Sequence, residues 1–315
     1  MNGFFAKGAG STPAPFVVLV LVLISLLTCQ PYPPTVTLAI MGDIMLGRGV
    51  NPGPDSFASI QHDLFASDLV LANLESPVSP NPPALRSSFN LCTISNRAEF
   101  LHSWGITLVS IANNHNLDCG PDGLKQTRSV LQKAGITPIG AKMEPVYLEK
   151  NNLHLAFLAF DDISSPLDEK AAEKAIRTAR LTGAVVVVSI HWGAEYQGGA
   201  SDRQKSLANE FSQAGAALVW GHHPHVLQPA VWIRSATVGG RDKKPTLVLY
   251  SLGNAIFDQG GLENTQQSAL VVVTMDGTGV TSIHCIPFVI DVINSRVFLP
   301  DAGTAAMIRD RLKLP

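Results

Sequence analysis

Cysteine is scarce in this sequence, which has four in 315 residues. Cys29 lies at the end of an N-terminal apolar segment, and the other three, Cys92, Cys119 and Cys285, are odd in number and irregularly spaced. This pattern argues against a disulfide framework and against a zinc site built from cysteines. One disulfide bond between two of these three residues stays open, and the sequence does not indicate which pair forms it.

An excess of charge of either sign is also absent. The chain has 23 Lys and Arg against 25 Asp and Glu, a formal net charge of -2. It therefore has no broad basic face, and we expect no nucleic acid partner. With 46% hydrophobic residues, the chain can bury a sizeable core and suits one large α/β domain or two small ones.

The N-terminal apolar segment is too short to cross a bilayer comfortably. Phe16–Thr28 is an uncharged run of 13 residues that follows a lone cation, Lys7. A membrane-spanning helix needs about 20 residues, whereas the apolar region of a secretory signal needs about 7–15. We therefore expect residues 1–29 to be a signal peptide, a lipoprotein signal or a membrane anchor, with export favoured, and the protein to lie outside the cytoplasm.

Cys29 bears on how the protein is attached to the membrane. It follows Leu26-Leu27-Thr28, which resembles a bacterial lipobox, although Thr is less usual before the cysteine than Gly, Ala or Ser. Lipidation at Cys29 and an ordinary cleavage that removes Cys29 both stay open. An uncleaved N-terminal segment is the other means of attachment.

The rest of the chain alternates short apolar strands with amphipathic helices. We expect a Pro-rich linker at 30–35, one domain at 36–300 and a C-terminal tail at 301–315. Alternation of this kind is typical of an α/β sandwich with a parallel or mixed sheet. The expected strands are Val36–Met41, Leu69–Ala72, Thr107–Ile111, Leu153–Phe160, Ala184–Ile190, Ala217–Trp220, Leu247–Tyr250 and Ala269–Met275, and the expected helices are Asp55–Phe65, Arg97–Trp104, Gly123–Ala134, Leu167–Leu181 and Asp202–Ala214.

Polar residues follow six of these strands. Open α/β sheets bind ligands beyond the carboxyl ends of their strands, so an enzyme of this class should carry its polar clusters there. Any one cluster has an ordinary explanation, such as a turn or a solvated charge, but six at one edge indicate a shared site. The clusters contain Asp43 and Arg48, Glu75, Asn114 with His115 and Asp118, His191 with Glu195, the histidines His222, His223 and His225, and Asn254.

These side chains suit divalent metal ions. Carboxylate, amide and neutral imidazole groups favour Mn, Fe, Zn or Mg over copper or an iron–sulfur cluster, and together they are the components of a centre of two ions. His223 and His225 are expected to point the same way, because side chains two apart share a face of extended chain. His222 then faces away, or is a ligand if the register is shifted by one.

Two residues beside this centre are candidates for catalysis. His115 directly follows Asn114, and we expect it to donate a proton or to support the ligands rather than to bind metal itself. Arg48 can hold a phosphate or carboxylate through two hydrogen bonds. A surface salt bridge is the alternative for Arg48.

Six motifs together resemble a known family. In order, they are similar to the motifs of the bacterial capsule synthesis protein family CapA, which is associated with poly-γ-glutamate, and the resemblance covers nearly all of residues 36–290. CapA in turn resembles the calcineurin-like metallophosphoesterases, which implies a four-layer α/β/β/α sandwich with a dinuclear metal centre. The motifs are GDIMLGR at 42–48, NLE at 73–75, ANNHNLDCG at 112–120, HWGAEY at 191–196, GHHPHVLQP at 221–229 and YSLGNAIFD at 250–258.

The resemblance assigns roles by position. It implies that Glu75 is the bridging carboxylate, that His115 is the catalytic acid, and that the remaining matched residues bind metal, namely Asp43, Asn114, His191, His223 and His225. This chain departs from the phosphoesterase pattern because Met45 stands where a histidine ligand is usual, and Glu75 where Asp is usual. A centre short of one imidazole holds its ions weakly, holds only one, or borrows Glu195 or His222; Asp118 and Asn254 are further candidates.

Three hypotheses about function stay open. The first is an extracytoplasmic component of poly-γ-glutamate-type capsule synthesis or export, acting on the polymer or its precursor with integral membrane subunits. The second is a metal-dependent hydrolase of phosphoester or amide bonds. The third is a module that binds the polymer without turning it over.

Overall fold

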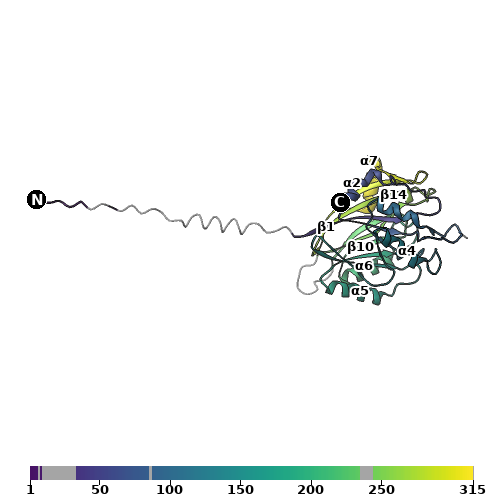
Figure 1. Ribbon diagram of the computed structural model, residues 1–315, viewed down its shortest axis with the longest axis horizontal. Helices are drawn as coiled ribbons and strands as arrows, with labels where there is room; N and C mark the ends of the chain where they lie inside the picture. The colour runs from purple at the N-terminus through teal and green to yellow at the C-terminus, as the bar shows by residue number, and fades with distance from the viewer. Residues whose placement is uncertain (6–7, 9–32, 85–86, 235–243, 315) are drawn as a thin grey trace. The chain divides into compact units, whose positions relative to one another are not determined.

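The computed structural model of the chain describes residues 1–5, 8, 33–84, 87–234 and 244–314 (Figure 1). Residues 34–315 form one compact unit, and Met1–Pro33 is assigned to another. Among the described residues, no helix has the length and apolar character needed to cross a membrane. The apolar run Phe16–Thr28 and Cys29 lie outside the described residues, as does the first half of the expected linker, residues 30–32. The last linker residue, Thr35, already belongs to the first strand.

Two sheets form the centre of the compact unit. The first has eight strands in the order β16-β15-β14-β1-β2-β5-β6, with β13 beside β1. Within it β1, β2, β5 and β6 run parallel, whereas β14 is antiparallel to β1. The strands are β1 Thr35–Ile44, β2 Leu69–Leu74, β5 Leu108–Ser110, β6 Thr137–Ile139, β13 Asn254–Ile256, β14 Gln267–Asp276, β15 Gly279–Asp291 and β16 Arg296–Phe298.

The second sheet has six strands in the order β11-β12-β10-β9-β8-β7. Its four central strands are parallel and its two edge strands are antiparallel. A hairpin turn at Asn151-Asn152 joins β7 and β8, and both residues have positive φ, of 50° and 61°, as a tight hairpin requires. The strands are β7 Val146–Lys150, β8 Leu153–Asp161, β9 Val185–His191, β10 Ala216–His222, β11 Leu227–Ile233 and β12 Thr246–Leu252; a separate pair consists of β3 Val78–Ser79 and β4 Thr93–Ile94.

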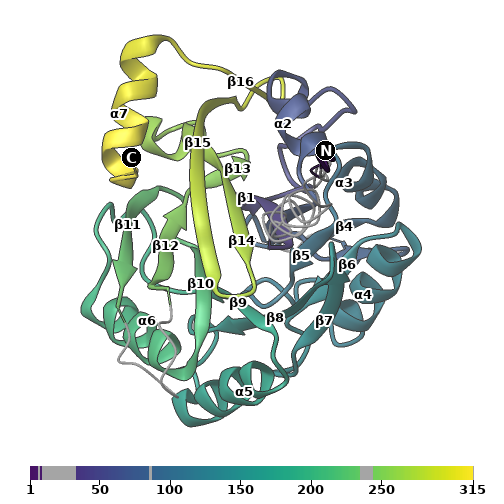
Figure 2. The ribbon, with the colours of Figure 1, turned by 90° about the vertical axis from the view of Figure 1, so that its left-hand side faces the viewer.

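Helices cover the outer face of each sheet. One apolar core lies between the two sheets, a second lies between the first sheet and α2, α3 and α4, and a third lies between the second sheet and α5 and α6. The expected four-layer α/β/β/α sandwich is therefore confirmed (Figure 2). The helices are α2 Gln61–Ala66, α3 Ala98–Ser103, α4 Gly123–Lys133, α5 Glu169–Leu181, α6 Asp202–Ala214 and α7 Ala302–Leu312, with short 3-10 turns at Ala58–Ile60, Ser95–Arg97 and Glu263–Gln266.

The sequence of β9 shows why these strands lie inside. Val185 and Val187 belong to the core between the sheets, whereas Val186 and Val188 belong to the core under α5 and α6. Alternate residues of a strand point to opposite faces, so a strand that is covered on both faces is apolar throughout. The indole N–H of Trp220, on β10, donates to the carbonyl of Met41, on β1, at 2.9 Å and ties the two sheets together.

The expected C-terminal tail at 301–315 is wrong. Residues 302–312 form α7, which begins at Asp301, whose carboxylate accepts a hydrogen bond from the Thr304 N–H at 2.9 Å. Ile308 and Leu312 of this helix are fully buried in the core between the sheets. The C-terminal segment is therefore part of the domain.

Candidate metal centre

The carboxyl ends of strands from both sheets meet at one place. On β1, Asp43 lies opposite Asn73 of β2 and Asn254 of β13 in the strand register. In the second sheet, His191 ends β9 and lies opposite His222 at the end of β10. Parallel pairing therefore places residues that are far apart in the sequence at adjacent positions.

Glycines allow the close approach that this convergence needs. A Cβ at Gly42 would lie 1.8 Å from the carbonyl oxygen of Gly253, so no larger residue fits where the Asp43 N–H donates to that same oxygen at 3.0 Å. A Cβ at Gly221 would lie 2.2 Å from the carbonyl oxygen of Tyr250. The glycines that precede Asp43 and His222 thus set the backbone packing of the site.

Seven of the predicted acidic and histidine residues lie in one cluster. Among the described residues, three groups have ligand atoms that all lie within 4.8 Å of one another. All members are buried except Glu195. The groups are Asp43 with His191 and His222, Asp43 with Glu75 and His225, and Glu195 with His223 and His225.

Of the two alternatives left open for His222, the structure agrees with the one in which it is a potential ligand, because His222 belongs to this cluster. Strand β10 continues to His222, and its ring Nδ1 lies 2.8 Å from Nδ1 of His191. Its other nitrogen, Nε2, lies 2.7 Å from the Ser189 hydroxyl. His191 Nε2 in turn lies 2.8 Å from Oδ1 of Asn114, so the structure brings this predicted amide into contact with the cluster.

His223 and His225 reach the cluster by a different geometry from the one expected. Both have positive φ, of 99° and 58°, so they lie in a turn and not in extended chain. Strand alternation therefore does not set the direction of the two rings, contrary to expectation, although both rings do enter one group with Glu195. His225 is held by Asn254, whose Oδ1 lies 2.9 Å from its Nδ1, and this places the predicted Asn254 behind the cluster.

The two buried carboxylates interact strongly. Burial raises the pKa of Glu75 well above its usual value, and the neighbouring charge of Asp43 raises it further. Burial alone would raise the pKa of Asp43 too. The hydrogen bond with His225 and the charge of His225 together outweigh burial, so the pKa of Asp43 is lowered. Burial alone would lower the pKa of His225, yet the Glu75 and Asp43 carboxylates raise it to about 9. A cation would therefore stabilise the ionised form of Glu75.

The other three imidazoles are neutral at pH 7. Burial lowers the pKa of His222 and of His223 to about 4. It lowers the pKa of His191 well below its usual value, and the neighbouring histidines act in the same direction. Neutral imidazole is the form that binds a metal, because the ring nitrogen then offers a lone pair.

Two buried atoms of the cluster have no hydrogen-bond partner. Among the described residues, they are Oε2 of Glu75 and Nδ1 of His223. Buried polar atoms are nearly always satisfied, so two unsatisfied atoms in one cluster need an explanation. A carboxylate oxygen and an imidazole nitrogen are atoms that bind Mn, Fe, Zn or Mg. The residues of the cluster therefore fit a divalent metal ion.

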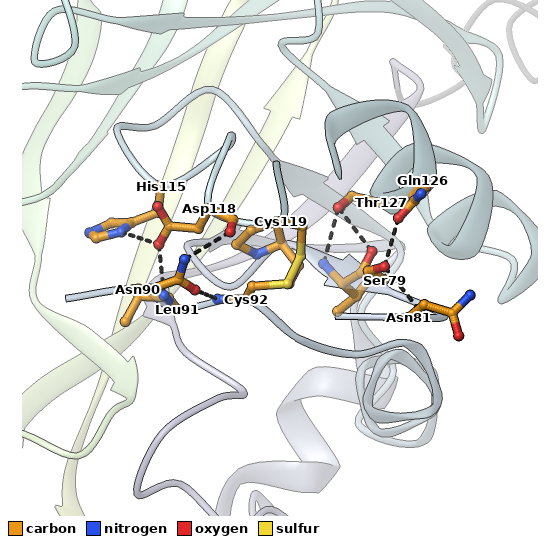
Figure 3. The surroundings of a disulfide bond; sticks show 12 residues. Ser79, Asn81, Asn90, Leu91, Cys92, His115, Asp118, Cys119, Gln126 and Thr127 are labelled. Carbon is orange, nitrogen blue, oxygen red and sulfur yellow. Dashed lines mark hydrogen bonds and ion pairs between the residues drawn. A yellow bond between two sulfur atoms is a disulfide. The ribbon is translucent and has the colours of Figure 1, made fainter. Parts of the chain in front are cut away.

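His115 lies beside the cluster and is paired with Asp118. Its Nδ1 lies 2.9 Å from Oδ2 of Asp118, which also accepts the Leu91 N–H at 2.7 Å (Figure 3). Cys92 follows Leu91 and Cys119 follows Asp118, and a disulfide bond joins these two cysteines. This bond answers the open question of which cysteines pair. Cys285 is free and buried.

Arg48 forms a salt bridge, which was the alternative to its role as an anion clamp. Its Nη2 and Nε donate to the Asp258 carboxylate, the latter at 3.1 Å, and its Nη1 donates to the Ser88 carbonyl at 3.1 Å. The guanidinium also lies 5.5 Å from the centre of the Phe257 ring. Arg48 is thus held beside the site by Asp258 and does not present a free guanidinium to a ligand.

Sequence reasoning missed two residues at the cluster. Asn73 is fully buried, its Nδ2 donates to Oδ1 of Asp43 at 2.8 Å, and its Oδ1 accepts from Nδ2 of Asn113 at 3.3 Å. Asp161 ends β8 opposite His191, and its charge raises the pKa of His223, against the larger effect of burial. Both follow strands directly, so the strand-end criterion that found the other residues identifies them too.

Comparison with known proteins places the chain in a family. The family model described as "Bacterial capsule synthesis protein PGA_cap" matches residues 37–259. The chain belongs to this family. The resemblance recognised in the six sequence motifs is thus confirmed.

Relatives of the chain are similar over most of its length. The PGA biosynthesis protein CapA of Bacillus subtilis (strain 168) is 34% identical over 271 residues, which are 76% of this chain and 68% of that protein. The capsule biosynthesis protein CapA of Bacillus anthracis is 30% identical over 309 residues, 88% of this chain and 71% of that protein. Among solved structures, the sulfate thiohydrolase SoxB of Thermus thermophilus has a TM-score of 0.49 and 14% identity, covering 90% of this chain and 61% of that chain.

Proposed function

We propose that this protein acts in the synthesis or export of a capsule polymer of the poly-γ-glutamate type, and that a centre of two divalent metal ions carries its activity. The names of its two Bacillus relatives support the pathway. The observation that carries the metal centre is the pair of unsatisfied buried atoms, Glu75 Oε2 and His223 Nδ1, inside one cluster of potential ligands. Asp43, Glu75 and the four clustered histidines would hold the ions, with Asn114 and Glu195 at the edge.

The proposal includes a place outside the cytoplasm, with attachment to the membrane through the N-terminal segment. The short apolar run Phe16–Thr28 supports export. The Cys92–Cys119 disulfide supports it too, because disulfide bonds persist in oxidising compartments and are rare in the cytosol. At this location, the expected partners are integral membrane subunits of a polymer synthase or exporter.

Hydrolysis of an amide or phosphoester bond is the reaction that the geometry favours. When bound, divalent ions polarise the oxygen of the scissile group and lower the pKa of a water molecule. His115 is held through Nδ1 by Asp118, which leaves Nε2 as the atom that donates a proton to the leaving group. Asn73 holds Asp43 in place, as residues behind metal ligands commonly do.

A complementation experiment tests the role of the centre. In a capsulated host that lacks its own copy, we expect the full chain to restore surface polymer, Asp55→Asn to restore it equally, and Asp43→Asn to fail. Asp55 is exposed and belongs to none of the three ligand groups, so Asp55→Asn removes the same charge and controls for charge and expression. Full restoration by Asp43→Asn at a normal protein level would contradict the proposal.

A second experiment separates turnover from binding. The full chain, purified in detergent with Mn²⁺, is incubated with poly-γ-glutamate and with an aryl phosphate. Shortened polymer or released phosphate that is lost in Asp43→Asn supports hydrolysis. Polymer binding without any product would instead assign the protein as a polymer-binding module.

A further inference from the structure

Two cavities adjoin each other next to the metal centre. One, of about 310 Å³, is lined by residues that include Tyr196, Val226, Asn264, Arg311 and Lys313. The other, of about 300 Å³, shares the first three of these residues. Because the two cavities share a wall, we treat them as one groove and call it the Tyr196 groove. Each half is at the lower end of the roughly 300–1,000 Å³ that small-ligand sites occupy.

The inner wall of the Tyr196 groove is continuous with the metal centre. Tyr196 directly follows Glu195, and Val226 directly follows His225, both members of the metal-ligand cluster. The rings of Tyr196 and His225 have centroids 6.2 Å apart. A substrate that reaches the cluster from this side therefore passes Tyr196.

Tyr196 is held in place by its surroundings. Its φ of 63° is unusual for a residue other than glycine, and its N–H donates to the carbonyl of Pro224 at 2.8 Å. Its hydroxyl accepts a hydrogen bond from Nε2 of Gln259 at 3.2 Å. The ring is thus a fixed wall between the cluster and the groove.

The outer end of the groove presents a guanidinium. Lys313 is paired with Asp310 at 3.0 Å. Arg311 has no carboxylate partner among the described residues; its Nη1 donates to Oε1 of Gln267 at 2.6 Å. The amide nitrogen of Gln267 also donates to Glu263 at 2.9 Å. Gln267 therefore holds Arg311 in place and lies between the charges of Arg311 and Glu263. Nε and Nη2 of Arg311 remain as donors, and a guanidinium binds a carboxylate through two such hydrogen bonds.

We propose that the Tyr196 groove binds the anionic polymer next to the bond that reacts, with Arg311 binding a free carboxylate of the chain. This inference rests on the proposed function, because it takes a polyglutamate-type chain as the ligand. Arg311 lies on α7, outside residues 37–259 that the family model matches. The groove therefore adds substrate contacts from a part of the chain that does not define the family.

Binding of fluorescently labelled poly-γ-glutamate to the full-length, detergent-purified protein tests this inference. We expect Arg311→Gln to weaken binding about tenfold, the equivalent of one charge-assisted hydrogen bond. Arg309→Gln removes the same charge from an exposed position of the same helix that does not line the groove, and should bind within about twofold of wild type. Poly-γ-glutamate whose carboxylates have been converted to amides should bind Arg311→Gln and wild type with the same affinity.

A second variant keeps the test independent of the packing of α7. Asn264 is exposed and lines both halves of the groove, so Asn264→Asp should fold normally and weaken binding several-fold at low salt by charge repulsion. If wild type binds the polymer and both groove variants bind as tightly as Arg309→Gln, the groove is overturned while the proposed function stands. If wild type itself does not bind, the proposed function is overturned together with the groove.

Discussion

Removal of the Cys92–Cys119 disulfide should destabilise the protein by about 3.5 kcal/mol. The two cysteines are 27 residues apart in the sequence, and a chain-entropy calculation for a loop of that length gives this value at 25 °C. The perturbation is the double variant Cys92→Ser, Cys119→Ser. Among the described residues, this variant retains only one cysteine, the buried Cys285, so no other disulfide bond can form between them.

The same change should impair the site. The disulfide joins the segment that carries Leu91 to the segment that carries Asp118, and the Leu91 N–H and the His115 ring meet at one oxygen of Asp118 (Figure 3). Without the covalent link, the orientation of His115 depends on hydrogen bonds alone. We expect a lower kcat in any hydrolytic assay, with metal content unchanged.

Urea unfolding, followed by tryptophan fluorescence, measures the loss of stability. The wild-type protein under reducing conditions should behave like the double variant, and oxidised wild type should have a clearly higher midpoint. A difference below about 1 kcal/mol between oxidised wild type and the double variant would show that closing this loop lowers the entropy of the unfolded state much less than the calculation requires.

Two further predictions concern His115 and Asp276. His115→Asn should lower the rate of hydrolysis about 10²–10⁴-fold with unchanged metal content, as expected for loss of a proton donor; equal loss of metal would show that His115 is a ligand instead. Burial alone would raise the pKa of Asp276, but hydrogen bonds from Lys244 and Thr278 lower it to about 2. Because its folded-state pKa is lowered, Asp276 stabilises the protein above its unfolded pKa of 3.8. Solvent screens this surface pair, so we expect about 1 kcal/mol or less to be lost as the pH falls from 4 to 2. In acid unfolding, Asp276→Asn should show a smaller pH dependence over this range, and an unchanged dependence would contradict the assignment.

Some features of the fold could be predicted from local pattern. The strands β9 and β10 are short apolar runs covered on both faces, and α6 has a capping box of Ser201 with Gln204 and ends at Gly215, which has a φ of 119°. Those signals are contained within a few residues. By contrast, the buried residues of α7 are Ile308 and Leu312. With so few apolar positions in contact with the core, its sequence resembles that of an exposed tail.

The candidate site shows the same division. The strand-end rule found Asp43, Glu75 and His191, because parallel pairing fixes where the ends of strands meet. It left the direction of His222 open, because that direction depends on where β10 ends. It failed for the conformation of His223 and His225, because a His-rich stretch does not reveal their positive φ angles. The ion pair of Arg48 with a residue 210 positions away, Asp258, requires knowledge of the tertiary structure.

The number of metal ions that the protein binds decides whether the cluster is a dinuclear metal centre. Metal-stripped full-length protein, titrated with Mn²⁺ in a calorimeter and then analysed for bound metal, should take up two ions per chain, and Asp43→Asn should lose at least one of them. Asp55→Asn should match wild type. If wild type bound no metal, or if Asp43→Asn bound as much metal as wild type, the cluster would not be the proposed metal centre.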